Sequence, residues 1–356
     1  MAKRSRRQRI AAAAAAAAAL FAKEYKFKVH CGVGDLIHIK AQLDSILDKV
    51  DRIFITPDTA ILAAVGRGKD NYAYLKFLEE FMHILFSNKK YILTKFCDLD
   101  HDNRCVERIH PVDKEYIRRY PVALHANEKI PFAYPDISAL LCSGMSLEIP
   151  QKYVVITTRV RDYSRIRYEE IKINFFHTLN HLALVHNIKV LILGEKKMAN
   201  TIEEKAMGIF GIYEDIISNL DSSVLIDMSD DVPLTSTPMG IEKLQQDCLY
   251  MNESLCTISF GIGGNFSLSV AANARAINLC DREKPLHPIF HNLYYEKIEI
   301  NDFLKNTKMK KSRNNLLSTR DISTFLKVIE NLYQLDRGDG HKSAQHSTKD
   351  PGALVP

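Results

Sequence analysis

Hydrophobic side chains recur along the chain with two alternating periods, one typical of short strands and one typical of amphipathic helices. Lys26–Cys31 alternates like a strand, positions 36–50 carry apolar residues at helical spacing, and Arg52–Thr56 is a second short strand. A helical stripe over Tyr72–Phe86 and a strand at Tyr91–Thr94 continue the alternation. This strand, helix, strand order is typical of a parallel α/β layer.

The second half of the chain repeats this order. Its expected strands and helices alternate, with strands at 153–157, 189–193, 224–227, 256–260 and 276–280, and helices over 171–185, 203–220, 241–251 and 322–333. No hairpin signal separates them, so we expect a second parallel sheet with helices on both faces. The predicted fold class is α/β, with two Rossmann-like domains facing across a cleft.

Prolines with broken periodicity mark the predicted connection between the two domains. We place an N-terminal domain at 23–143 and a C-terminal domain at 144–304, followed by a basic loop and a helix at 305–336. Residues 1–22 hold a basic run and nine consecutive alanines, and we expect a leader or tag outside the fold. A twin-arginine export signal is the alternative for this segment. The polar residues 337–356 are expected to be a disordered tail or vector residues.

Composition narrows the class of protein. The 356 residues are 46% hydrophobic and 26% charged, which is typical of a soluble globular protein. The net charge is +5, and five positive charges near the N-terminus account for it: Lys3, Arg4, Arg6, Arg7 and Arg9. The remainder is therefore neutral, which argues against a nucleic-acid partner. Seven cysteines without a tight framework favour reduced thiols and a cytoplasmic location.

A glycine-rich stretch separates two predicted strands of the second domain. An apolar run at 256–260 precedes it, and positions 268–274 are compatible with a helix. The glycines and the potential helix-capping residues are Gly261, Gly263, Gly264, Asn265 and Ser267. Backbone N–H groups of such a loop, at the carboxyl end of a parallel strand, favour an anion such as a diphosphate. A tight strand-to-helix turn is the alternative, but three glycines exceed what a turn needs.

Other strands of the same domain are expected to end in loops with polar or cationic side chains. The loop after the first strand offers Thr158, Arg159 and Arg161, and guanidinium groups can neutralise a departing diphosphate. Lys196 follows the next strand, and Ser229 lies in a loop that could contact a nucleoside. Solvated loops are the alternative interpretation of all these segments.

In the first domain, Gly32–Asp35 is expected to form a tight turn before a helix that begins at Leu36. Gly32 and Gly34 would let the backbone approach a ligand closely. Asp35 could act as a general base. Alternatively, it could cap the helix, and a capping carboxylate is stabilised in its charged form, which lowers its basicity.

These two glycine motifs resemble those of GT-B glycosyltransferases, and in detail the heptosyltransferase family of lipopolysaccharide synthesis. The N-terminal match is Gly32–Leu43, against that family's Gly-x-Gly-Asp turn and helix, and the C-terminal match is Leu244–Leu279. The resemblance implies an inverting, metal-independent transferase without a cofactor. It implies a nucleotide-sugar donor on the C-terminal domain, a carbohydrate or glycolipid acceptor on the N-terminal domain, and Asp35 as the base.

The chain also departs from that family. The family usually carries an Asp-Ser-Gly-Pro-x-His loop where this chain has Gly261–Ser267, so a donor sugar other than heptose is expected. A nucleotide-sugar epimerase of the same fold and a non-catalytic nucleotide-sugar-binding protein are the alternatives. The loop at 97–110 holds Cys, His and Asp, but its spacing matches no tetrahedral metal site, so no metal is expected. The basic stretch Lys308–Arg320 is either a solvated loop or a peripheral membrane contact.

Overall fold

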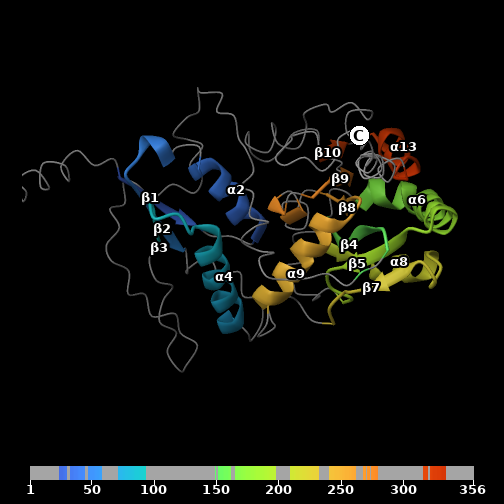
Figure 1. Ribbon diagram of the computed structural model, residues 1–356, viewed down its shortest axis with the longest axis horizontal. Helices are drawn as coiled ribbons and strands as arrows, with labels where there is room; N and C mark the ends of the chain where they lie inside the picture. The colour runs from blue at the N-terminus through green and yellow to red at the C-terminus, as the bar shows by residue number, and fades with distance from the viewer. Residues whose placement is uncertain are drawn as a thin grey trace, which may run out of the picture. The chain divides into compact units, whose positions relative to one another are not determined.

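The computed structural model describes two compact units, Met1–Pro135 and Asp136–Pro356 (Figure 1). The described residues are 24–29, 33–44, 47–57, 71–93, 149, 151–161, 165–197, 209–231, 240–261, 268–269, 271–272, 274–279, 316–319 and 321–333. Within these ranges, no helix combines the length and the apolar character needed to cross a membrane. The predicted domain boundary between residues 143 and 144 lies outside the described residues and stays a prediction.

The first unit contains a parallel sheet of three strands in the order β1–β2–β3. The strands are β1 (Glu24–Val29), β2 (Arg52–Pro57) and β3 (Tyr91–Leu93). The helical segments are α2 (Val33–Asp44), the 3₁₀ helix η1 (Leu47–Lys49) and α4 (Asn71–Leu85). Each strand pairs with the next one along the chain, and α2 contacts α4. The predicted parallel α/β layer is therefore confirmed.

The apolar stripes of α2 and α4 form the core of this unit together with β2. Their buried members are Leu36, Ile37, Leu43, Phe77, Leu78, Phe81, Met82 and Leu85. The end of α2 is fixed to β3, because the Tyr91 hydroxyl donates a 2.7 Å hydrogen bond to the Asp44 carboxylate. Burial, reinforced by the charge of Asp44, raises the pKa of Tyr91, so this phenol keeps its proton and remains a donor.

Among the described residues, the second unit has a seven-stranded sheet, in which six strands follow the order β10–β9–β8–β4–β5–β7 and β6 lies off this path. Its strands are β4 (Tyr153–Arg161), β5 (Lys189–Leu193), β6 (Ile209–Gly211), β7 (Leu225–Asp227), β8 (Thr257–Phe260), β9 (Ala276–Leu279) and β10 (Leu316–Thr319). All neighbours on this path are parallel, and β6 pairs antiparallel with the end of β4. Along the chain, the strands first run from β4 through β5 to β7, and then from β8 through β9 to β10 on the other side of β4. The topological switch point therefore lies between β4 and β8.

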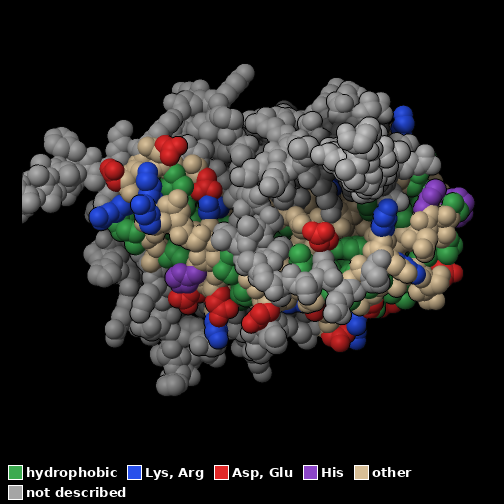
Figure 2. All heavy atoms as spheres, in the orientation of Figure 1, with side chains coloured by type: hydrophobic (Ala, Val, Ile, Leu, Met, Phe, Trp, Pro, Cys, Tyr) green, Lys and Arg blue, Asp and Glu red, His purple; other side chains and the backbone are tan. Residues whose placement is uncertain are grey.

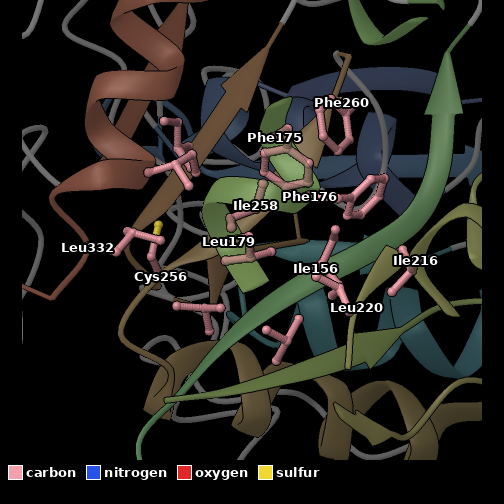
Figure 3. Packing of buried hydrophobic residues seen from close by; sticks show 14 of the residues in the cluster. Ile156, Phe175, Phe176, Leu179, Ile216, Leu220, Cys256, Ile258, Phe260 and Leu332 are labelled. Carbon is pink, nitrogen blue, oxygen red and sulfur yellow. The ribbon is translucent and has the colours of Figure 1, made fainter. Parts of the chain in front are cut away.

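Helices cover both faces of this sheet. They are α6 (Arg165–His186), α8 (Tyr213–Asn219), α9 (Gly240–Glu253) and α13 (Ile322–Glu330). On one face, alternate strand residues such as Ile156 and Ile258 pack with α6, α8 and α13 in a single hydrophobic core (Figure 3). In this core the ring centroids of Phe175 and Phe260 are 5.4 Å apart, and the two rings are perpendicular. On the other face, the Tyr153 hydroxyl donates to the Tyr250 carbonyl of α9 at 3.0 Å. This is the doubly wound parallel sheet that the sequence predicts, and it confirms the α/β class.

The face of the sheet opposite that core is unusually polar. Strands buried on both faces are normally apolar throughout. Here the buried residues that point away from the cluster of α6 include Thr157, Thr257, Ser259 and Asn278. The Ser259 hydroxyl lies 3.3 Å from the Asn278 side-chain oxygen and can donate to it. The sheet therefore carries a buried polar stripe on the face opposite the apolar core.

Four predictions about elements are wrong. Helix α2 begins at Val33, so residues 33–35 are helical and do not form a turn before Leu36. The expected helix over 203–220 is shorter, because β6 precedes α8. Strand β4 continues to Arg161 instead of ending at 157. Part of the basic stretch before Arg320 is strand β10, which pairs with β9 and extends the main sheet.

Candidate functional site

The candidate donor residues gather at the carboxyl ends of the parallel strands in the second unit. Lys196 follows β5, Ser229 follows β7, and Gly261 directly follows β8. In an open α/β sheet, ligands bind outside these strand ends, next to the switch point. The strand ends supply the polar groups, while the sheet and its helices hold their backbones in place.

The residues predicted in the first loop lie inside strand β4 instead. Arg159 is in register with Gly211 of β6, and Arg161 with Ile209. The pairing of β4 with β8 is irregular between Ile156 and Val160, so β4 is distorted beside the switch point. Arg159 is half-buried. Arg159 and Arg161 therefore lie in a strand and not in a loop, and their role at a diphosphate stays a prediction.

Thr158 lies against Gly194 at the end of β5. A Cβ atom placed on Gly194 would be 2.4 Å from the Thr158 hydroxyl oxygen, and Gly194 has a φ of +111°. The Thr158 side chain is fully buried, and its carbonyl accepts from the Ile212 N–H at 2.9 Å. Its hydroxyl has no hydrogen-bond partner among the residues that the structure describes. Only glycine fits this position, because both the backbone angle and the space exclude a side chain.

Asp227, the last residue of β7, is the centre of a hydrogen-bonded group of side chains. The Tyr213 hydroxyl donates to its carboxylate at 2.8 Å, and both the backbone N–H and the hydroxyl of Ser229 donate to its other oxygen. The Lys196 ammonium lies 3.8 Å from Asp227 and 3.3 Å from Asp231. Lys196 and Ser229, which the sequence placed in separate loops, thus meet at one carboxylate.

These contacts set the charges at the strand ends. Burial alone would raise the pKa of Asp227, but the hydrogen bonds from Ser229 and Tyr213 and the charge of Lys196 outweigh it, so the pKa is lowered. Hydrogen bonding to Asp231, followed by the charge of Asp227, raises the pKa of Lys196. At neutral pH the group therefore holds an ionised carboxylate and an ionised ammonium close to solvent.

Lys243 connects helix α9 to the loop after β7. Its ammonium donates to the Met228 carbonyl at 3.1 Å, lies 3.6 Å from Asp230, and pairs with Asp247 one turn further along α9. Asp247 is almost completely buried, and burial raises its pKa to about 6 despite the attraction of Lys243. The Lys243 side chain thus attaches the loop after β7 to α9.

The glycine loop begins with a residue that has a positive φ. Gly261 has a φ of 86°, and its N–H donates to the Leu279 carbonyl at 2.7 Å, which continues the pairing of β8 with β9. Leu268, Ser269 and Ala271 are helical, and the Ser269 hydroxyl contacts the Met251 sulfur of α9 at 3.4 Å. Four other predicted phosphate contacts lie outside the described residues: Gly263, Gly264, Asn265 and Ser267.

In the first unit, Gly34 and Asp35 lie in the first turn of α2, and Gly32 lies outside the described residues. Asp35 therefore does not cap a helix that starts at Leu36. Its role as a base stays a prediction.

Metal-ligating residues do not cluster in groups of three or more anywhere in the part of the chain that the structure describes. The loop at 97–110 lies outside that part. Sequence reasoning missed the contributions of Asp227, Lys243 and Asp247. A signal was present for each: Asp227 closes a strand, and Lys243 and Asp247 stand four residues apart on one helix face.

Comparison with known proteins gives only distant similarities. No family model and no curated protein matches the sequence. A family 9 glycosyl transferase from Veillonella parvula is 10% identical with a TM-score of 0.39, over 89% of this chain and 96% of that chain. Heptosyltransferase WaaC of E. coli is 10% identical with a TM-score of 0.40, over 88% and 99% of the respective chains. Glycosyltransferase TibC of enterotoxigenic E. coli is 11% identical with a TM-score of 0.37, over 73% of this chain and 58% of that chain.

The chain is thus similar to solved structures of the class that its sequence motifs indicated. At these identities and overlaps, the likeness concerns the fold and gives no argument about substrate or activity.

Proposed function

We propose that the chain is a glycosyltransferase that moves a sugar from a nucleotide-diphosphate donor to a carbohydrate or glycolipid acceptor. One observation carries the proposal: the parallel sheet of the second unit reverses its order between β4 and β8, and a glycine with a positive φ directly follows β8. A glycine-rich loop at such a switch point presents backbone N–H groups to a phosphate.

The side chains at the neighbouring strand ends fit the rest of a nucleotide. An acidic residue at a strand end can accept hydrogen bonds from ribose hydroxyls. Asp227 has this position, and its lowered pKa keeps it an acceptor at neutral pH. Lys196 supplies a cation next to it. We infer that the nucleoside lies over the ends of β5 and β7, and the diphosphate at the glycine loop.

The chemistry then follows from the charges. An acceptor hydroxyl attacks the anomeric carbon of the donor sugar, its proton passes to a base, and the bond from that carbon to the diphosphate oxygen breaks. The diphosphate leaves with an added negative charge, which Arg159, Arg161 and Lys196 would neutralise without a metal ion. A single displacement of this kind inverts the anomeric configuration, and Asp35 is the proposed base.

Donor binding is tested by thermal shift with a panel of nucleotide diphosphates and nucleotide sugars. The matched pair of variants is Lys196→Met, in the loop after β5, and Lys189→Met, at the amino end of β5. Lys196→Met should lower the shift caused by the bound nucleotide, whereas Lys189→Met should leave it unchanged. If the nucleotide caused equal thermal shifts in both variants, Lys196 would be excluded as a binding residue.

Turnover is tested with the nucleotide sugars that bind. Release of nucleotide diphosphate that depends on an added carbohydrate acceptor supports transfer, and Asp35→Asn should lower this rate at least tenfold. Asp48→Asn, at an exposed position of the same unit, is the control. Conversion of the donor without an acceptor would instead support an epimerase, and binding without any turnover would support a nucleotide-sugar-binding protein. No binding to any member of the panel would refute the proposal.

A further inference from the structure

Helix α6 carries an apolar line on its solvent side, opposite the face that enters the core. Ile166, Ile173 and Leu184 are 66%, 73% and 50% exposed. At about 100° per residue, these three positions and His177 fall within about 20° of one direction. The buried residues of the same helix, including Tyr168 and Phe175, point the other way. An amphipathic helix on a protein surface normally has polar residues along this line.

Single exposed apolar residues are common and need no explanation, but an aligned series on one helix indicates an interaction surface. Val185, which is 60% exposed, widens the line at its C-terminal end. Figure 2 shows hydrophobic and histidine side chains next to one another at the edge of the second unit where Figure 1 labels α6. We call this surface the α6 stripe: Ile166, Ile173, His177, Leu184 and Val185.

We propose that the α6 stripe binds a second copy of this chain, with the two α6 helices antiparallel. The stripe is self-complementary about a point near residue 175. In that register Ile166 lies opposite Leu184 of the second copy, and Ile173 lies opposite His177. A two-fold axis produces both contacts twice, as an isologous interface requires.

The charges beside the stripe favour the antiparallel arrangement. The exposed carboxylates Glu169 and Glu170 lie in the first half of α6, and His177 and His181 lie in the second half. Helical geometry places Glu170 and His181 on the same flank of the stripe, so an antiparallel partner brings them together. A parallel partner would place carboxylate beside carboxylate, which is unfavourable.

The size of the stripe sets the expected strength of the dimer. The distance from Ile166 to Leu184 along the helix is about 27 Å at 1.5 Å per residue. One helix pair of this length covers less than the roughly 800 Å² per partner of a typical stable interface. We therefore expect a reversible dimer that forms at micromolar concentrations. The flanking carboxylates disfavour an anionic lipid surface as the occupant.

Sedimentation velocity of the full chain, from about 2 to about 200 µM, tests the proposal. The wild type should shift from the monomer toward twice its mass as the concentration rises. Ile173→Lys should stay monomeric over the whole range, since it places a cation at the centre of the stripe, opposite His177 of the second copy. Ile217→Lys, at an exposed isoleucine of α8 outside the stripe, should still dimerise. A monomeric wild type, or equal loss in both variants, would overturn the proposal.

A charge exchange tests the antiparallel register. Glu170→Lys and His181→Glu should each weaken the dimer at least fivefold, and the double variant should recover most of the loss because the attraction is restored with reversed sign. Glu170 also pairs with Arg167 of its own helix at 3.2 Å, so thermal melts must first show that each variant is folded. A double variant as weak as the two single ones would exclude this register, and a dimer unaffected by all three variants would exclude the α6 stripe.

Discussion

Replacing Gly194 by alanine tests how tightly strands β4 and β5 come together beside the proposed donor site. The Cβ atom would lie 2.4 Å from the Thr158 hydroxyl oxygen, 3.6 Å from the Thr158 Cβ and 3.5 Å from its backbone nitrogen. Only the first of these contacts is shorter than van der Waals distance. The steric conflict of the variant is therefore with one atom, and that atom can be removed separately.

Two effects contribute to the loss of stability. The φ of +111° is unfavourable for any residue with a side chain, and this strain costs about 1 kcal/mol. Thr158 is fully buried in a paired strand, so its hydroxyl cannot easily move away. Overpacking of this kind costs about 2 kcal/mol. We expect Gly194→Ala to lower the free energy of unfolding by about 3 kcal/mol.

A double-mutant cycle with Thr158→Ala separates the two effects. Thr158→Ala removes the hydroxyl, which has no hydrogen-bond partner in the described part of the chain, so its own effect on stability should be small. In this background, Gly194→Ala should cost only the backbone strain of about 1 kcal/mol, which gives a coupling energy of about 2 kcal/mol. Urea unfolding followed by far-UV circular dichroism measures all four variants. A coupling energy near zero would refute the close approach, and a neutral Gly194→Ala would refute both effects.

Three further changes test other contacts of the fold. Burial raises the pKa of Asp247 to about 6, above its ordinary value of 3.8. Ionising Asp247 is therefore less favourable in the folded chain than in the unfolded chain, so the stability that its protonated form provides at low pH is lost as pH rises through 6. The stability of Asp247→Asn relative to wild type, from urea unfolding, should therefore increase by roughly 2 kcal/mol between about pH 4 and about pH 7; a constant difference would contradict the raised pKa. Tyr168→Phe removes a 2.7 Å hydrogen bond to Asp215 and should cost about 1 kcal/mol, whereas no loss would mean that water replaces this bond fully. Asp321 caps α13 by accepting from two backbone N–H groups, so Asp321→Ala should lower the melting temperature and Asp321→Asn should retain most of it; equal losses would exclude capping.

Periodic patterns predicted the long elements well. The helical stripe over 171–185 belongs to α6. Ile171, Phe175 and Leu179 are buried as the spacing indicated, whereas Val185, at the end of the same predicted stripe, is exposed. The apolar runs at 256–260 and 276–280 correspond closely to β8 and β9. These segments are defined by burial of their own side chains, so the local sequence contains the information needed to recognise them.

The short elements depend on distant partners, and local patterns did not reveal them. Strand β6 has three residues and exists through its pairing with the end of β4, which lies about fifty residues earlier in the sequence. Strand β10 sits in a segment with many lysines, and its hydrogen bonds with β9 define it. The extension of β4 to Arg161 likewise depends on β6. Cationic side chains favoured a loop interpretation because the partner strands were not evident.

The same reason explains why the candidate site was only partly predicted from sequence. The strand ends were identified from glycines and cations, but the contacts that fix them join residues far apart in the chain. The Asp230 N–H donates to the Gly194 carbonyl at 2.7 Å, and the Lys196 N–H donates to the Asp230 carbonyl at 2.8 Å, so the loops after β5 and β7 are fastened to one another. Lys243 then ties the second loop to α9, the helix that leads directly into β8 and Gly261.

This arrangement bears on how a ligand would be held. Asp227 and Lys196 are already positioned by Tyr213, Ser229 and the paired loops, so binding at these groups would require little further ordering of side chains. The connection through α9 also gives a physical route between the strand ends of β7 and the glycine loop, because a shift of α9 would move Lys243 and the start of β8 together. We expect the affinity for a nucleotide that spans both strand ends to depend on the Lys243 contacts even though Lys243 need not touch it, because Lys243 joins the loop after β7 to α9.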